Sequence, residues 1–309
     1  MKKFIMMVGL PASGKSTIAK KYAEKENAII ISTDELREEL LGDEASQENN
    51  ELVFKEAEKR IKENLNNNKN VIFDATNLSY KRRRNWLDKL HDHKTHMVAI
   101  LVATPYEECI ERNLKRERKV PEEVIKNMYY NFYVPQYCEG FNEIIVEYNS
   151  DYKFTFEDLK DISQDNPHHR LSVLEHCKMA EKYSSDLAEE KGVCTTHTIV
   201  LAALLHDIGK LKTKTFINTK GEETEIAHFY NHEKVGAYDS LFYETIKTEL
   251  QSQVGLRVVI ALRIIKLIQW HMLLWLDLSD KSIKKYKKFL GSFFWYDLQL
   301  LHIADKEAH

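Results

Sequence analysis

Gly9-Leu10-Pro11-Ala12-Ser13-Gly14-Lys15-Ser16-Thr17 directly follows an apolar run from Phe4 to Val8. The glycine-rich stretch therefore has both the preceding strand and the spacing of a phosphate-binding P-loop. In such a loop, backbone N–H groups surround the phosphates of a nucleotide, Lys15 reaches the β and γ oxygens, and the Ser16 hydroxyl binds Mg²⁺. The sequence predicts a nucleoside triphosphate and magnesium site formed by Gly9, Ser13, Gly14, Lys15, Ser16 and Thr17.

Short β-rich runs alternate with helical patterns in the first half of the chain. This alternation indicates a parallel sheet with helices on both faces and ligands at the carboxyl ends of the strands. We therefore expect an α/β domain with a parallel five-stranded sheet over residues 1–150. The predicted strands are Phe4–Val8, Ala28–Ser32, Asn70–Asp74, Met97–Val102 and Glu143–Glu147.

The second half of the chain has a different pattern. Residues 151–166 are polar and acidic, and we interpret them as a linker. Strand patterns mostly vanish afterwards, so we predict an all-α domain over residues 167–309. Charged residues such as Arg263 and Lys266 interrupt the apolar region 254–278, which favours a buried helix over a membrane span. The predicted helices are Leu171–Lys191, Thr195–Ile208, Phe229–Leu250, Arg257–Leu276 and Gly291–Ala304.

Length and composition limit the possible classes of protein. A chain of 309 residues is long enough for about two domains. The net charge of -3 excludes a globally basic nucleic-acid binder, so local clusters must carry any polyanion binding. The four cysteines form no CxxC pair, which is typical of free thiols in a reducing cytosol, and we expect a cytoplasmic protein.

The second predicted strand ends beside acidic and basic residues. Asp34 lies at the same sheet edge as the P-loop, where its carboxylate could accept the proton of an attacking hydroxyl. Arg37, one helical turn later, is placed to hold a phosphate of the acceptor. Asp34 could instead be a helix N-cap, but its position after strand two, with a P-loop after strand one, favours catalysis.

The third predicted strand ends in Asp74-Ala75-Thr76-Asn77, and the basic run Lys81–Arg84 follows. Both segments lie on the predicted ligand edge, which makes Asp74, Thr76, Asn77 and Arg83 candidates for positioning the acceptor or a metal. Helix capping by the first three residues and a solvated helix face for the basic run are the alternatives.

A third basic segment, Arg112–Lys119, precedes Val120-Pro121. A mobile segment with several arginines could close over the phosphates and neutralise charge during phosphoryl transfer. Arg116 is the first candidate for this role and Arg112 the second. A helix end balanced by Glu111 and Glu117 is the alternative.

GLPASGKST, STDELR, DATN and RNLKRERKVP, in this order and spacing, resemble the polynucleotide 5′-kinase family over roughly residues 1–150. The resemblance implies that Asp34 is the general base, that Arg37 binds a phosphate of the acceptor strand and that Arg116 is the lid arginine. It also implies ATP with Mg²⁺ as the donor. Related P-loop kinases of small molecules share the first motif and often DATN, so a small-molecule acceptor stays open.

Ten of the thirteen histidines follow Asp161. His206 and Asp207, at the end of an apolar helix, can coordinate one divalent ion, and Lys210 could face an anionic substrate. A hydrogen-bonded structural pair is the alternative. Mixed His and Asp ligands suit manganese, iron, nickel, cobalt or magnesium better than a Cys-rich zinc site. Further candidate ligands are His176, His228, His232, His271 and Asp305.

The chain from about Pro167 onward resembles the HD-domain phosphohydrolase superfamily. His176, the pair His206-Asp207, and Asp305 in LLHIADKEAH match its H…HD…D pattern, and PHHRLSVLEHC with FYNHEKVGAY resembles the HD domain of tRNA nucleotidyltransferases. The resemblance implies that these residues bind metal and that Asp207 is catalytic. It adds His232 as a further ligand or phosphate contact, and His271 as another. His169 could contact the substrate phosphate, with a surface histidine at a helix entrance as the alternative, and Lys210 is the second candidate for a phosphate contact.

Two phosphate chemistries on one chain resemble the known pairing of an HD phosphoesterase with a polynucleotide kinase. We therefore expect a bifunctional end-healing enzyme for nucleic acid, with RNA favoured over DNA. It would phosphorylate 5′-hydroxyl ends with ATP and hydrolyse 2′,3′-cyclic phosphate and phosphate ends with Mn²⁺, Ni²⁺, Co²⁺ or Fe²⁺. RNA or DNA ends and a separate downstream ligase are the expected partners, with no membrane partner.

Two other classes of function stay open. The first is a small-molecule or nucleoside kinase fused to a nucleotide phosphohydrolase, and the second is a nucleotide sensor without catalysis. Overall acidity favours a small-molecule acceptor, whereas Lys81–Arg84 and Arg112–Lys119 favour a polyanion.

Overall fold

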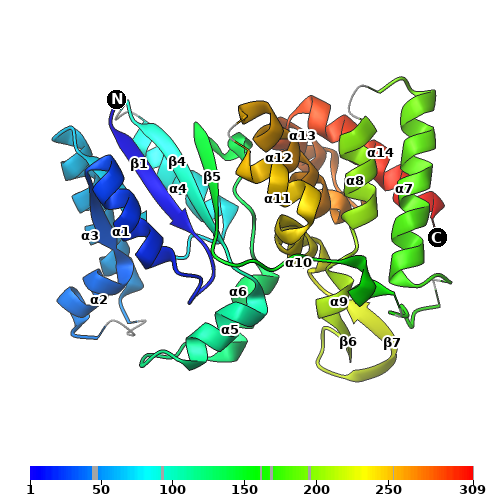
Figure 1. The fold of residues 1–309 in the computed structure, drawn as a ribbon, viewed down its shortest axis with the longest axis horizontal. Coiled ribbons are helices and arrows are strands. Elements are labelled where there is room, and N and C mark those ends of the chain that lie inside the picture. The colour runs from blue at the N-terminus through cyan, green and yellow to red at the C-terminus, as the bar shows by residue number, and fades with distance from the viewer. Residues whose placement is uncertain are drawn as a thin grey trace. The chain divides into compact units, whose positions relative to one another are not determined.

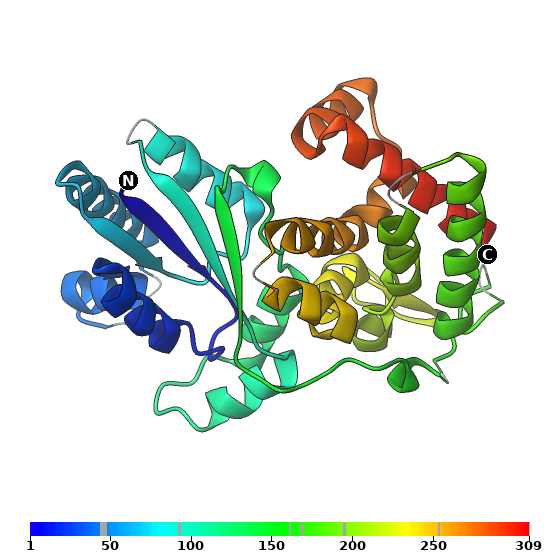
Figure 2. The ribbon, with the colours of Figure 1, turned by 45° about the horizontal axis from the view of Figure 1, so that its top comes forward.

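The computed structural model describes residues 1–43, 48–91, 94–160, 162–167, 170–193, 196–252 and 254–308. The chain divides into two compact units (Figures 1 and 2). The first, called the kinase unit below, contains Met1–Met128 and Pro135–Asp151. The second, called the helical unit, contains Tyr129–Val134 and Tyr152–His309.

A parallel sheet of five strands forms the centre of the kinase unit, as the alternating pattern predicted. Its order is β2-β3-β1-β4-β5, and every neighbouring pair runs parallel. The inner strands are almost entirely buried apolar runs, as expected for a sheet covered on both faces. The strands are β1 (Lys3–Val8), β2 (Ala28–Ser32), β3 (Asn70–Asp74), β4 (His96–Ala103) and β5 (Glu143–Tyr148).

Alternate residues of the strands face different helices. Ile5 and Met7 of β1 pack with Ala19 and Tyr22 of α1, whereas Phe73 of β3 stacks on the neighbouring Phe4 and packs on Trp86 of α4. Because side chains alternate along a strand, α1 and α4 cover opposite faces of the sheet. The helices of this part of the chain are α1 (Lys15–Glu26), α2 (Thr33–Leu41), α3 (Asn50–Asn66), α4 (Tyr80–Leu90), α5 (Tyr106–Leu114), α6 (Glu122–Tyr130) and η2 (Tyr137–Glu139).

The helical unit contains the expected helices, with differences in detail. The predicted helix Phe229–Leu250 is divided into α10, η4 and α11, and α13 was not predicted. The helices are η3 (Phe156–Leu159), α7 (Val173–Glu190), α8 (Thr196–Leu205), α9 (Lys210–Thr213), α10 (His232–Asp239), η4 (Ser240–Phe242), α11 (Glu244–Gln251), α12 (Gly255–Trp270), η5 (His271–Trp275), α13 (Asp280–Leu290) and α14 (Ser292–Glu307).

The prediction of an entirely α-helical second domain was wrong at one place. Two antiparallel strands, β6 (Lys214–Ile217) and β7 (Glu223–Phe229), form a hairpin between α9 and α10. Its turn is closed by hydrogen bonds from the N–H of Asn218 to the Glu222 carbonyl and from the N–H of Gly221 to the Asn218 carbonyl. The asparagine and the glycine, which has φ +83°, are the residues that such a turn favours.

The short segment Tyr129–Val134 departs from a simple division of the chain near residue 150. The Phe132 ring packs 4.7 Å from that of Tyr238, and the Tyr129 hydroxyl donates to Asp239 Oδ1 at 2.6 Å. The backbone N–H of Val134 donates to Gln269 Oε1 at 2.8 Å. The core of the helical unit therefore includes residues that precede the last strand of the kinase sheet.

One helical stretch within the described residues, Gly255–Trp275, has the length and apolar composition of a membrane span. In its most apolar part, 61% of the residues are buried inside the protein, as they are in the core helix of a globular domain. The stretch is therefore weak evidence for a membrane.

Candidate phosphoryl-transfer and metal sites

The P-loop connects β1 to α1 and is held in place from several sides. The N–H of Gly9 donates to the Thr76 carbonyl at 3.1 Å. The Ser13 carbonyl accepts hydrogen bonds from the Thr104 hydroxyl at 2.9 Å and from the Asn149 amide at 2.8 Å. Gly14 has φ 93°, and a Cβ there would lie 2.4 Å from Asn149 Nδ2. Only glycine fits this backbone without displacing Asn149.

Lys15 points back into the loop that precedes it. Its ammonium donates to the Leu10 carbonyl at 2.7 Å, and burial lowers its pKa. Within the described residues, the buried Ser13 hydroxyl has no hydrogen-bond partner. Ser16 and Thr17 follow in the first turn of α1 with exposed side chains. The loop thus offers a cation, a hydroxyl and a helix N-terminus to a phosphate group.

Asp74, at the end of β3, accepts a hydrogen bond from the Ser16 side chain. Burial raises the pKa of the Asp74 carboxyl, and the Lys15 charge opposes that rise. A hydroxyl and a carboxylate side by side are oxygen ligands that suit Mg²⁺. The sequence assigned Asp74 to the acceptor, whereas its contacts place it beside the P-loop residues that would hold the donor phosphates.

Asp34 lies in the first turn of α2 with its side chain 52% exposed. Arg37 Nη1 donates to Asp34 Oδ1 at 2.7 Å, and Arg37 Nη2 donates to Asn50 Oδ1 at 3.3 Å. Over the described part of the chain, the buried Nε of Arg37 has no partner. The pair therefore offers an exposed carboxylate and a guanidinium with a spare donor.

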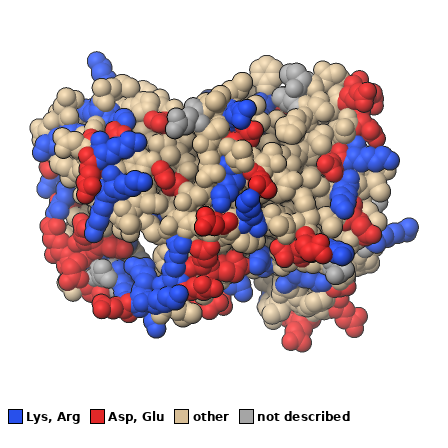
Figure 3. All heavy atoms as spheres, in the orientation of Figure 1, with Lys and Arg blue, Asp and Glu red and all other residues tan. Residues whose placement is uncertain are grey.

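The predicted lid segment follows α5, and two of its arginines lie on the ligand side of the kinase unit. Arg118 Nη1 lies 3.7 Å from Asp34 Oδ2, and the charge of Arg116 is among the factors that lower the pKa of Lys15. Figure 3 shows Lys and Arg side chains gathered near the loop that follows α5, with Asp and Glu side chains beside them. Sequence analysis named Arg116 and missed Arg118, because spacing alone does not show which arginine faces Asp34.

Arg112 is occupied by the protein itself. Its Nη2 donates to Glu108 Oε2 at 2.9 Å and to the Asn149 carbonyl at 2.6 Å. Since the Asn149 amide also donates to the Ser13 carbonyl, Arg112 stabilises the P-loop indirectly, through Asn149. Asn149 falls at the start of the polar region after β5, and no local pattern in the sequence marked it.

The prediction that Arg83 binds the acceptor was wrong. Arg83 is fully buried and forms a two-pronged ion pair with Glu139, with both N···O distances 2.7 Å. Its Nη1 donates to the Asn77 and Leu78 carbonyls at 2.8 and 3.0 Å. Asn77 donates to the Met7 carbonyl at 2.8 Å. Arg83 and Asn77 thus support the strand ends from inside the protein. In the DATN segment, Asp74 and Thr76 are the residues that contact the P-loop.

Four histidines in the helical unit share one hydrogen-bonding arrangement. Each places Nδ1 next to a backbone carbonyl, at 3.2 Å for His176 with Ala308 and at 2.7 Å for the other three. When Nδ1–H donates to that carbonyl, the Nε2 lone pair of the neutral ring points the other way. The other three pairs are His206 with Ala203, His232 with Phe229, and His271 with Ile268.

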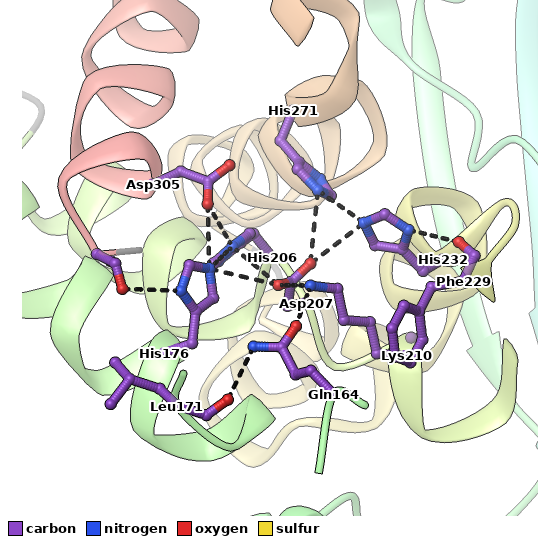
Figure 4. Close-up of polar contacts among 12 residues, drawn as sticks. Gln164, Leu171, His176, His206, Asp207, Lys210, Phe229, His232, His271 and Asp305 are labelled. Atoms are coloured by element: carbon purple, nitrogen blue, oxygen red, sulfur yellow. Dashed lines mark hydrogen bonds and ion pairs between the residues drawn. The ribbon is translucent and has the colours of Figure 1, made fainter. Parts of the chain in front are cut away.

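These four Nε2 atoms converge on Asp207 and Asp305 (Figure 4). His176 Nε2 lies 3.2 Å from His206 Nε2 and 3.1 Å from Asp305 Oδ1, and both imidazoles lie 3.4 Å from Asp207 Oδ2. On the other side, Asp207 Oδ1 lies 3.2 Å from His232 Nε2 and 3.7 Å from His271 Nε2. Asp207 therefore joins two groups of candidate ligands, one oxygen to each.

This donor set fits divalent metal ions. Two neutral imidazoles whose unprotonated Nε2 atoms face each other at 3.1–3.2 Å repel unless a proton or a cation lies between them. Burial, with the nearby imidazoles of His232 and His206, lowers the pKa of His271 to about 3, which keeps its lone pair free at neutral pH. Burial disfavours charge on His206, but Asp207 and Asp305 outweigh it and raise its pKa well above the ordinary value. Six residues from four helices and the turn after α8 thus form a concentrated ligand set.

Close contact of two glycines brings the metal-site elements together. Gly209 follows the His206-Asp207 pair, and a Cβ there would lie 2.1 Å from the His232 carbonyl oxygen and 2.5 Å from the Gly236 nitrogen. No side chain fits in that space. The start of α10, which carries His232, can therefore approach Asp207. Gly236 in FYNHEKVGAY was the unused sequence clue to this packing.

Lys210 reaches the same carboxylate, with Nζ 2.7 Å from Asp207 Oδ2 and also 2.7 Å from Gln164 Oε1. Because Lys210 is buried and its ammonium contacts both side chains, it orients Asp207 and Gln164 in this structure (Figure 4). His228 lies outside the cluster, on β7, where its Nε2 is 3.2 Å from the Thr224 hydroxyl. The predicted phosphate contact His169 lies outside the described residues.

The fold and the two sites define a P-loop kinase domain joined to an HD domain. A family model described as an AAA domain matches residues 4–135, and the HD domain model matches residues 173–290. Kinase domains of this kind use ATP with Mg²⁺, and HD domains bind divalent metals.

The chain belongs to the family of P-loop kinases that includes L-seryl-tRNA(Sec) kinase of Methanococcus maripaludis. It is 34% identical to that protein over 193 residues, which cover 60% of this chain and 74% of the relative. It is also 29% identical over 158 residues to heterogeneous nuclear ribonucleoprotein U-like protein 2 of Mus musculus, covering 45% of this chain and 21% of that protein.

Among solved structures, a chain of the Pnkp1/Rnl/Hen1 RNA repair complex is 25% identical with a TM-score of 0.39. The match covers 41% of this chain and 42% of that one, so this chain spans less than half of its length.

Proposed function

We propose that the chain is a bifunctional RNA end-healing enzyme. Its kinase unit would phosphorylate 5′-hydroxyl ends with ATP, and its HD domain would open 2′,3′-cyclic phosphate ends with one water and release the remaining phosphate with a second. The observation that carries this proposal is the occurrence, in one chain, of an exposed carboxylate flanked by arginines beside a P-loop and a six-residue His and Asp cluster. DNA ends are the less favoured substrate of the same chemistry.

Asp34 is suited to the acceptor side of a kinase reaction. Its exposed carboxylate could take the proton of an attacking 5′-hydroxyl while Lys15 and the P-loop hold the donor. Arg37, whose guanidinium lies against Asp34, could bind a phosphate of the acceptor strand. Arg116 and Arg118 would neutralise charge on the transferred group.

The HD cluster is suited to phosphoester hydrolysis. A divalent metal bound by these ligands supplies a water of lowered pKa and a clamp on phosphate oxygens. Asp207 holds both ligand groups together, and the backbone carbonyls fix the ring orientation of all four histidines. Lys210 would hold Asp207 in place and contribute positive charge near a phosphate.

The two reactions serve one purpose on RNA. Opening a 2′,3′-cyclic phosphate and removing the phosphate gives a hydroxyl end, and the kinase gives a 5′-phosphate. These are the ends that a separate ligase joins. The likeness to L-seryl-tRNA(Sec) kinase supports an acceptor hydroxyl carried on RNA.

The same likeness supports a second candidate, a kinase for the seryl hydroxyl of an aminoacylated tRNA. A small-molecule or nucleoside acceptor, with the HD domain acting on nucleotides, is the third. The three candidates share the same donor site and differ in the acceptor of the kinase, and the third differs also in the substrate of the HD domain.

The test compares acceptors with labelled ATP: 5′-hydroxyl RNA and DNA oligonucleotides, seryl-tRNA and nucleosides. A separate assay uses 2′,3′-cyclic phosphate RNA with Mn²⁺, Ni²⁺ or Mg²⁺. Lys15→Ala should lower only the kinase rate, by at least about 100-fold. Asp207→Ala should abolish only the hydrolysis.

Matched controls are Lys20→Ala on the exposed face of α1 and Asp186→Ala on the exposed face of α7, both expected to behave as wild type. Transfer to seryl-tRNA or nucleosides without transfer to oligonucleotides would replace the proposed acceptor. Loss of both activities in either single variant would contradict two independent sites.

A further inference from the structure

Helix α13 is strongly basic, although the chain as a whole is slightly acidic. Its eleven residues, DKSIKKYKKFL, include five exposed lysines. Within the described residues, no carboxylate pairs with any of them. Unpaired positive charge at this density attracts a polyanion. The lysines are Lys281, Lys284, Lys285, Lys287 and Lys288.

The apolar side of α13 is already used inside the protein. The rings of Tyr286 and Phe289 lie 5.7 and 6.2 Å from that of Trp270 on α12. The Leu290 carbonyl accepts a hydrogen bond from Lys266 Nζ at 2.9 Å. A helix that enters a membrane surface needs its apolar side free. The packing of α13 therefore favours a polyanion in water over a lipid surface.

Exposed aromatic rings follow directly after this basic helix. Phe293 is 85% exposed and Tyr296 is 45% exposed, and both lie in the first turns of α14. Residues three apart share one face of a helix, so the two rings face the same way. Aromatic rings beside a positive surface are the combination that binds single strands, because bases stack on the rings while lysines follow the backbone.

The same helix leads to the metal cluster. Asp305 lies near the other end of α14, roughly 18 Å from Phe293 along the helix axis. Trp275, which precedes α13, donates from its indole Nε1 to Asp305 Oδ2 at 3.0 Å and remains 40% exposed. Asp305 is buried on a different side of α14 from the two exposed rings, so a strand bound at the start of α14 would run along and around the helix, past the exposed Trp275, to reach the cluster.

We propose that α13, with Phe293 and Tyr296, is a binding surface for single-stranded nucleic acid that presents a strand end to the HD metal cluster. This surface, called the α13 surface below, rests on the proposed phosphoesterase function and adds the polymer to it. In a chain with net charge -3, such a surface would favour an oligonucleotide over a mononucleotide at the same cluster.

The binding test uses the full chain and a fluorescein-labelled single-stranded oligouridylate, titrated in EDTA without ATP. The variant Lys284→Glu/Lys288→Glu should bind about tenfold more weakly at low salt, and the dependence of log K on log salt should fall by roughly 1.4. Phe293→Ala should weaken binding without changing that dependence. The control Lys178→Glu/Lys182→Glu alters two exposed lysines of the same spacing on α7 and should change affinity by less than about twofold.

The activity test compares 2′,3′-cyclic AMP with an oligonucleotide ending in a 2′,3′-cyclic phosphate, both with Mn²⁺. The α13 variants should lose turnover of the oligonucleotide through a higher KM and keep turnover of the mononucleotide. If they bind and turn over the oligonucleotide as the α7 control does, the α13 surface is refuted. Loss of binding to phosphatidylserine vesicles alone would refute it in favour of a lipid partner. If wild type hydrolyses neither substrate yet binds the strand through α13, the proposed hydrolysis fails and the surface stands.

Discussion

Burial raises the pKa of the Asp74 carboxyl, and the Lys15 charge only partly offsets this. In the unfolded chain this pKa is about 3.9, so the folded state binds the proton more tightly. Ionised Asp74 therefore costs stability once the pH rises above the unfolded value, and the cost grows until the pH passes the folded value. A residue suited to magnesium binding is thus expected to weaken the nucleotide-free fold.

Asp74→Asn should raise the free energy of unfolding of the nucleotide-free kinase unit by roughly 1–2 kcal/mol at pH 7. The gain should shrink as the pH falls and disappear below about pH 3, where the wild-type carboxyl is protonated in both states. Calorimetry between these pH values measures it, with the exposed Asp88→Asn on α4 as control. A destabilised Asn variant at pH 7 would mean that the contacts with Ser16 and Lys15 outweigh burial.

The Arg83 and Glu139 pair gives a second prediction at this scale. Both side chains are buried, so Glu139→Gln leaves the guanidinium without its counter-charge. We expect a loss of about 3–5 kcal/mol of stability. Urea unfolding measures it. Glu39→Gln, which removes one of the two carboxylate partners of Arg60 at the surface, should have little effect. If the two substitutions have equal effects, the buried pair stabilises the fold no more than a surface ion pair does. That result would contradict the role of Arg83 as an internal support of the P-loop edge.

The residue types of both sites could be predicted from sequence, but the direction of individual side chains could not. The P-loop, Asp34 and the His and Asp ligands stand in patterns whose chemistry is local. Which member of Lys81–Arg84 turns inward depends on Glu139, which lies on a distant segment. In the same way, only the folded loop shows that Arg118 faces Asp34.

At the scale of elements, the tight contact between Gly209 and α10 positions His232. In Gly209→Ala the new methyl group would meet the His232 carbonyl oxygen and push α10 away from Asp207. We expect roughly 10–100-fold weaker Mn²⁺ binding and a matching loss of hydrolysis, with kinase activity kept. Metal titration followed by the two assays measures this.

Gly255→Ala is the matched control for this substitution, because a Cβ there would meet no atom within 4 Å. Wild-type Mn²⁺ affinity in the Gly209 variant would show that the helices can separate without moving His232.

The five strands were predictable because buried parallel strands are continuous apolar runs between turns. The hairpin β6–β7 was missed because its strands are largely exposed and rich in Thr and Glu, with no apolar run. Helix α13 was missed for the same reason, since five of its eleven residues are lysines and its aromatic side chains pack on Trp270 of α12. Periodicity thus reports elements that bury a face, and reports poorly those that serve a surface.

At the scale of the whole molecule, the chain enters the helical unit at Tyr129–Val134 and then returns to complete the kinase unit. Phe132 and Val134 are fully buried and Tyr129 nearly so, all within the helical unit, although the last strand of the kinase sheet, β5, comes later in the chain. A cut after Asp151 would therefore remove part of the helical core and leave it exposed on the other fragment. Exposed apolar surface of this kind leads to aggregation.

We expect fragments 1–151 and 152–309 to be insoluble when each is expressed alone and to co-purify when expressed together. A single cut between Lys220 and Gly221, in the exposed hairpin turn, is the matched control and should leave both activities unchanged. Gel filtration and the two activity assays on each preparation measure the outcome. If fragment 152–309 alone is monomeric and hydrolyses the cyclic phosphate at the wild-type rate, then Tyr129–Val134 is dispensable to the helical core. In that case the two activities would be separable at the boundary near residue 150 that the sequence predicts. The helical unit would then fold without any residue from the first half of the chain.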